Sequence, residues 1–168
     1  MPSNKDRLYV ALYEPRYHWA LIVGPKVGDE GSLGVRYHAK ERPKVAGVSE
    51  WFFEESECTP APSSMLLVRI MIGKVADANR LVGILQNTPI RQGHPGWNCV
   101  FCVKEALEKL KVNPSALGTS VDDWETVRRE AINYCQRKKE QHRFDGQGDF
   151  NMRQAPTYDL MERKEIIV

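Results

Sequence analysis

Residues 98–112 read NCVFCVKEALEKLKV and predict an amphipathic helix that packs one face against a core. Apolar side chains recur at intervals of three and four residues, which is the spacing of one helix face. Asn98 is a favoured N-cap residue, so the helix is expected to begin at Cys99, and Asn113-Pro114 ends it. The apolar stripe comprises Val103, Ala106, Leu107 and Leu110.

Most of the chain before this helix consists of short segments rich in β-branched and aromatic residues, which favour strands. Strands are expected at Arg7–Tyr13, His18–Gly24, Val35–Lys40, Ser49–Phe53 and Met65–Lys74. Two further segments show helical periodicity, Asp77–Gln86 and Val121–Arg143. Strands followed by helices indicate an α+β fold, in which an antiparallel sheet packs against the helix that carries Cys99.

Glycine and proline mark the expected loops. Lys26–Gly34 contains three glycines and Glu54–Ser64 contains two prolines, so both are expected to be irregular. The first of these loops joins His18–Gly24 to Val35–Lys40, and we expect those two strands to pair as a hairpin.

The length of 168 residues fits one domain with a tail. Residues 1–143 are expected to form that domain. Residues 144–168 lose periodicity and are expected to form an extended C-terminal tail, with Glu165–Val168 pairing at a sheet edge.

The composition excludes several classes of protein. The 24 basic and 22 acidic residues nearly balance, which argues against a nucleic-acid-binding protein with a broad basic face. No segment approaches the roughly 20 apolar residues that span a bilayer, and the N-terminal segment lacks the apolar region of a secretory signal. Four scattered cysteines are too few for a disulfide scaffold. We therefore expect a cytoplasmic protein with reduced thiols and no transmembrane segment.

Cys99, His18 and His38 have predicted positions that suit nucleophilic chemistry. A thiol in the first turn of a helix feels the positive end of the helix dipole, which favours the nucleophilic thiolate. The expected hairpin places the two histidines on neighbouring strands, so that one histidine can take the thiol proton and the second can orient the ring of the first. Candidates to contact the oxyanion or the substrate are Tyr17, Trp97 and Asn98.

Three short motifs resemble those of known enzymes. The segment Tyr13–Gly24, YEPRYHWALIVG, resembles the histidine-bearing strand of the lecithin retinol acyltransferase and HRAS-like phospholipase/acyltransferase families. Val35–Ala39, VRYHA, looks like their second histidine-bearing strand, and Asn98–Val103, NCVFCV, resembles the start of their nucleophile helix. These families have a circularly permuted papain-like fold of the NlpC type, in which the histidines precede the cysteine in the sequence.

The resemblance implies a role for each candidate. Cys99 would be the nucleophile, His18 the general base and His38 its orienting partner, as a Cys-His-His triad. The implied reaction is acyl transfer through a cysteine thioester, ending in hydrolysis or in transfer to an acceptor. The substrate would be a small-molecule or lipid-like ester, thioester or amide, and the reaction would use no metal and no organic cofactor.

Three other interpretations of the same residues stay open. Cys99 and Cys102 form a C-x-x-C pair, which is typical of thiol redox proteins. Cys99, Cys102 and His94, with a more distant histidine, have the donor types of a zinc site. The chain also suits a non-catalytic interaction module on the same fold. The sequence leaves the oligomeric state open.

Overall fold

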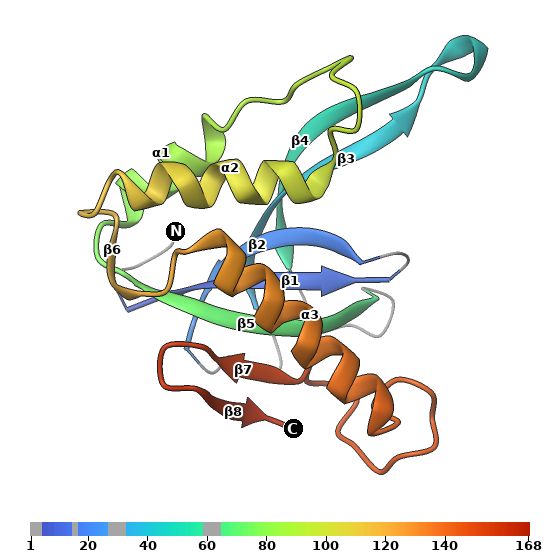
Figure 1. Ribbon diagram of the computed structural model, residues 1–168, viewed down its shortest axis with the longest axis vertical. Helices are drawn as coiled ribbons and strands as arrows, with labels where there is room; N and C mark the ends of the chain where they lie inside the picture. Colours follow the sequence, from blue (N-terminus) through green and yellow to red (C-terminus); the bar gives the residue numbers. More distant parts are fainter. Residues whose placement is uncertain (1–4, 15–16, 27–32, 59–64) are drawn as a thin grey trace.

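The computed structural model describes residues 5–14, 17–26, 33–58 and 65–168 and shows an α+β fold (Figure 1), as expected. Within these residues, a sheet of eight strands packs against three α-helices. The strands are β1 (Arg7–Tyr13), β2 (His18–Gly24), β3 (Gly34–Pro43), β4 (Ser49–Cys58), β5 (Leu66–Val75), β6 (Leu117–Ser120), β7 (Thr157–Asp159) and β8 (Lys164–Ile167). The helices are α1 (Ala78–Gln86), α2 (Cys99–Lys111) and α3 (Trp124–Glu140).

The sheet is mixed, which corrects the expectation of a purely antiparallel one. Its strands lie in the order β4-β3-β2-β1-β5-β7-β8, and β6 also pairs with β5. Neighbouring strands are antiparallel except β5 and β7, which run parallel. A parallel pair needs a long crossover connection. Here all three helices and β6 lie between β5 and β7 in the sequence, and they provide it.

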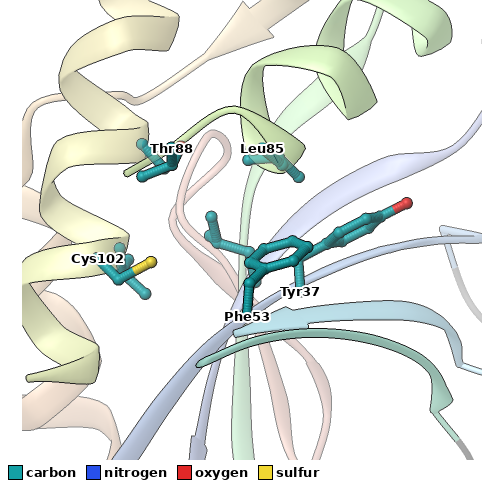
Figure 2. A pocket seen from close by; sticks show the side chains of 8 residues that line it. Tyr37, Phe53, Leu85, Thr88 and Cys102 are labelled. Carbon is teal, nitrogen blue, oxygen red and sulfur yellow. The ribbon is translucent and has the colours of Figure 1, made fainter. Parts of the chain in front are cut away.

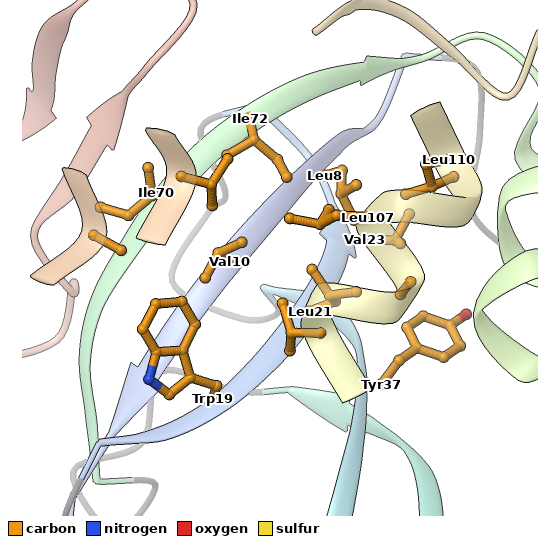
Figure 3. Close-up of a cluster of buried hydrophobic side chains, with 14 of the residues drawn as sticks. Leu8, Val10, Trp19, Leu21, Val23, Tyr37, Ile70, Ile72, Leu107 and Leu110 are labelled. Carbon is orange, nitrogen blue, oxygen red and sulfur yellow. The ribbon is translucent and has the colours of Figure 1, made fainter. Parts of the chain in front are cut away.

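The central strands are buried on both faces. Successive side chains of a strand point to opposite faces, so Val10 packs with the helices whereas Ala11 lies in a second apolar cluster on the other face. Figure 3 shows Leu107 and Leu110 of α2 beside Val23 of β2 in the larger cluster. Burial on both faces explains why these strands appear in the sequence as nearly continuous apolar runs.

Strand β4 is longer than the sequence suggested. It continues to Cys58 and pairs with β3 without interruption from Pro43 opposite Ser49 to Gly34 opposite Cys58. Residues 54–58, expected to begin a loop, are therefore part of a strand, because pairing with β3 outweighs the local signal of the prolines that follow. Residues 59–64 lie outside the described part, as do residues 27–32 of the other expected loop.

The third helix is shorter than expected. Its N-cap is Asp123, whose carboxylate accepts a hydrogen bond from the Thr126 backbone N–H at 3.1 Å, so the helix begins at Trp124 and not at Val121. It ends at Glu140, three residues before the expected end. Among the described residues, no helix is both long and apolar enough to cross a membrane.

The segment expected as a tail contributes two strands to the sheet. β7 pairs with β5, and β8 pairs with β7 at the sheet edge. Glu165 of β8 is held by α3, since its carboxylate accepts a hydrogen bond from Tyr134 Oη at 2.6 Å and forms an ion pair with Lys138 Nζ at 2.6 Å. The Lys138 side chain is only 1% exposed, so this carboxylate compensates a buried charge.

We expect Glu165→Ala to destabilise the protein by about 2–3 kcal/mol, because it leaves the Lys138 ammonium buried without its carboxylate. The loss is smaller than for a fully buried pair because Glu165 is 28% exposed. Denaturant unfolding measures it. Glu162→Ala is the matched control, since Glu162 pairs with the exposed Lys164. Equal stability of the two variants would contradict a role of Glu165 in anchoring β8.

Candidate active site

The antiparallel pairing of β2, β3 and β4 brings three polar side chains into contact in a row: His18, His38 and Glu54. His18 is the first residue of β2, and its Nε2 lies 2.6 Å from Nδ1 of His38 on β3. His38 is directly opposite Glu54 of β4 in the register, and its Nε2 lies 2.8 Å from the Glu54 carboxylate. The two histidines therefore contact each other as expected, and the His38 ring is held at both nitrogens.

The start of α2 brings the Cys99 thiol to the end of β2. Asn98 caps the helix by accepting the Val100 backbone N–H at 3.0 Å, which fixes Cys99 as the first helical residue. The Cys99 sulfur accepts the Trp19 backbone N–H at 3.5 Å. That N–H belongs to the peptide that joins His18 to Trp19, so the sulfur lies next to the His18 backbone. In the described part of the chain, the thiol forms no hydrogen bond with the His18 ring.

Cys99, His18 and His38 all line one open cleft of about 650 Å³. Its apolar wall includes Trp51, Met65 and Val100, and its charged residues include Arg36, Lys40, Glu14 and Glu41. A cleft of this size, which combines apolar side chains with convergent polar and charged groups, is large enough for a small molecule.

Burial determines the charge state of the thiol and of the His18 ring. It raises the pKa of Cys99, an effect that the backbone N–H of Trp19 only partly opposes. Burial also lowers the pKa of His18, and the positive charges of Arg36 and Lys40 lower it further. Both groups are therefore neutral near neutral pH. The expected thiolate at the helix start is wrong, because Cys99 is only 9% exposed and loss of hydration outweighs the helix dipole.

Glu54 is a site residue that the sequence analysis missed. The hydrogen bond from His38 is the main reason that its pKa is lowered, so it is ionised at neutral pH. The predicted strand ended at Phe53, five residues before the end of β4, and so excluded Glu54. Extending it by pairing with the His38 strand would have found Glu54, because directly opposed residues of an antiparallel pair face the same side.

Tyr17 and Asn98 line the cleft, but the Tyr17 hydroxyl serves another contact. Tyr17 has a left-handed backbone with φ 54°. Its hydroxyl interacts with Lys139 and Cys135 of α3, and the Lys139 ammonium lies 4.4 Å from the ring centre. The ring therefore contributes to the cleft wall, and the interactions of the hydroxyl with α3 are the ones that the structure shows. The role of Tyr17 as an oxyanion donor stays a prediction.

Trp51, and not Trp97, is the tryptophan at the cleft. Trp97 is buried and packs edge-to-face against Trp51, with ring centres 5.4 Å apart. The expectation that Trp97 contacts the substrate is corrected, because Trp97 packs against Trp51 and does not line the cleft. The sequence could not distinguish the two, because their roles depend on how the connection before α2 packs against β4.

Cys102 points away from the cleft into the core. Figure 2 shows it on α2 facing Phe53 and Tyr37. These side chains line a small void of about 10 Å³. Burial raises the pKa of Cys102 to about 12, so its thiol stays protonated. All four cysteines are free thiols, and His94 is exposed. In the described ranges, no three histidine, cysteine or acidic side chains gather as a metal ion would require.

We expect Cys102→Ala to leave the alkylation rate of Cys99 within about twofold of wild type. The thiol fills core space only, so the expected cost is about 1 kcal/mol of stability. Peptide mass spectrometry after iodoacetamide treatment, with denaturant unfolding alongside, measures both effects. A large drop in Cys99 reactivity in a folded Cys102→Ala protein would instead support the redox interpretation.

Comparison with known proteins identifies the family to which the chain belongs. Residues 5–167 match the model of DUF6914, described as a family of unknown function. The chain is a member of DUF6914. The matched region extends from before β1 to the end of β8 and so includes the whole cleft of this DUF6914 member. No curated protein and no solved structure matches the chain.

Proposed function

We propose that this DUF6914 protein is a cysteine-dependent acyl hydrolase or acyltransferase that works through a thioester on Cys99. One observation carries the proposal: the Cys99 thiol lies at the peptide of His18, whose ring is held by His38, inside an open cleft. A nucleophile, a nearby base and a group that orients the base form the minimal set for this chemistry.

The neutral charge states favour general-base catalysis. The His18 nitrogen that does not face His38 takes the Cys99 proton as the sulfur attacks the substrate carbonyl carbon. The C=O electron pair moves onto oxygen, and the Cys99 N–H and the Asn98 amide stabilise the oxyanion. When the intermediate collapses, protonated His18 gives its proton to the leaving group, and the acyl group stays on sulfur.

The second half of the reaction releases the acyl group. His18 takes a proton from water or an acceptor nucleophile, which attacks the thioester carbonyl. The carbon–sulfur bond breaks, and the thiolate regains its proton from His18. In the free protein, the thiol and the His18 ring are not hydrogen-bonded to each other, and such catalytic contacts commonly tighten only when substrate binds.

The arrangement of elements supports a permuted papain-like fold of the NlpC type. His18 and His38 precede Cys99 in the chain, and the nucleophile begins a helix packed on the β2 and β3 strands. Together with the three sequence motifs, this arrangement favours acyl chemistry over a redox or zinc function. The cleft suits an ester, a thioester or an amide.

The test is acylation of Cys99 by p-nitrophenyl acetate and p-nitrophenyl butyrate. We expect a burst of p-nitrophenolate equal to the protein concentration and an acyl group on the Cys99 peptide by mass spectrometry. Cys99→Ser should abolish the thioester adduct, whereas Cys135→Ser, at a buried cysteine outside the cleft, should retain it. Acylation of Cys99 no faster than that of N-acetylcysteine would overturn the proposal and favour the interaction module.

A further inference from the structure

Glu54 lies at the outer end of the chain of polar side chains that begins at His18. Its carboxylate accepts a hydrogen bond from His38 Nε2 at 2.8 Å. Two cations of β3 flank it, with Arg36 Nη2 at 3.6 Å and Lys40 Nζ at 3.7 Å. The His38 side chain is 3% exposed, so its ring has little access to water as an alternative partner.

When both histidines are neutral, only one placement of hydrogens is consistent with the contacts among His18, His38 and Glu54. An ionised carboxylate can only accept, so His38 Nε2 carries a hydrogen. A neutral imidazole has one N–H, so His38 Nδ1 is an acceptor. His18 Nε2, 2.6 Å away, must then donate to it. His18 Nδ1 is left without a hydrogen and holds the lone pair that a base needs.

We propose that Glu54 is a positioning residue that sets the tautomers of His38 and His18, so that His18 presents Nδ1 as the base. The inference rests on the proposed cysteine–histidine chemistry for its consequence, although the tautomers themselves can be measured without any substrate. Glu54 touches neither Cys99 nor the reacting atoms and acts through His38. No proton leaves the carboxylate or His38 during the reaction.

The carboxylate also stabilises the charged form of His18. When His18 takes the Cys99 proton, Glu54 is the negative charge that opposes the nearby cations. Among the described residues, the titratable or charged groups around the His18 ring, including those that share its cleft, are Tyr13, Glu14, Tyr17, Arg36, His38, Lys40, Glu41, Glu54 and Cys99. Arg36 and Lys40 lower the pKa of His18 whereas Glu54 raises it, so removing the carboxylate lowers that pKa further.

The first test is long-range ¹H–¹⁵N NMR of histidine-labelled protein at neutral pH. In wild type, we expect both histidines to carry the hydrogen on Nε2 alone. Glu54→Ala removes the acceptor, so His38 should become a mixture of tautomers and His18 should follow it. Glu50→Ala is the matched control, because Glu50 lies on the same strand and its carboxylate pairs with Arg42 and Lys44. Unchanged tautomers in a folded Glu54→Ala protein would overturn the proposal.

The second test is the pH dependence of Cys99 acylation in Glu54→Gln. The amide oxygen can still accept from His38, so this variant removes the charge and keeps a hydrogen bond. We expect the acid limb of the rate profile to move to lower pH by about half a unit to one unit. The plateau should fall about 10-fold, the lower end of what outer partners of functional histidines contribute.

The two tests separate the two proposals. A merely structural Glu54 would lower stability and rate without moving the acid limb, and that result would overturn the inference. If wild type fails to acylate Cys99 at all, the proposed function fails. The wild-type and Glu54→Ala NMR spectra then still decide whether Glu54 sets the tautomers.

Discussion

His18→Ala should slow acylation of Cys99 about 10²–10⁴-fold at neutral pH, the usual contribution of a positioned general base. The effect is large because burial raises the pKa of Cys99 and leaves little thiolate to react unaided. As long as the pH is below the pKa of Cys99, each increase of one pH unit raises the thiolate fraction, and with it the rate of His18→Ala, about tenfold. The wild-type acylation rate, in contrast, should not depend on pH once His18 is neutral. Because the pKa of His18 is lowered, this plateau should begin at a lower pH than for an ordinary histidine.

The defect of His18→Ala should therefore shrink as the pH rises. Stopped-flow measurement of p-nitrophenolate release from near pH 5 to pH 10 checks this convergence. His94→Ala is the matched control, because His94 is exposed and does not line the cleft. A rate ratio that stays constant over the whole pH range would indicate that His18 supports the site structurally and does not accept the proton.

Asn98→Ser should lower the acylation rate about 10²–10³-fold, which is the usual cost of one lost oxyanion donor. Asn98 Oδ1 is held by the Val100 N–H, so the cap of α2 determines which end of the amide is free. The other end is Nδ2, a donor that forms no hydrogen bond with the described residues, and Asn98 lines the cleft. Serine keeps a capping oxygen and lacks this donor, so the fold should keep its stability to within about 0.5 kcal/mol.

Two further variants separate the cap from the donor. Asn98→Asp retains the cap and replaces the donor by an acceptor, so its melting temperature should hold while acylation is lost. Asp123→Ala removes the corresponding cap of α3 and should lower the melting temperature with no effect on acylation. Normal acylation by Asn98→Ser would show that backbone N–H groups alone bind the oxyanion. Circular dichroism melts and burst kinetics provide both measurements.

Much of the secondary structure was predictable because local chemistry determines it. The β1 and β2 strands have the bounds that their β-branched and aromatic residues predict. Asn98 starts α2 where its capping oxygen predicts. The strands β6 and β7 were missed, since each is three or four residues long and is stabilised by pairing with β5. Their sequences alone carry too little propensity to reveal them.

The candidate site divides in the same way. The sequence by itself determined that Cys99 begins a helix and that His18 and His38 lie on paired strands, because caps and alternation are local signals. Only the tertiary structure decided that Glu54 faces His38, that Trp51 lines the cleft in front of Trp97, and that the thiol and the His18 ring are neutral. Register between distant strands and burial in a shared core decide these features, and both depend on residues far apart in the chain.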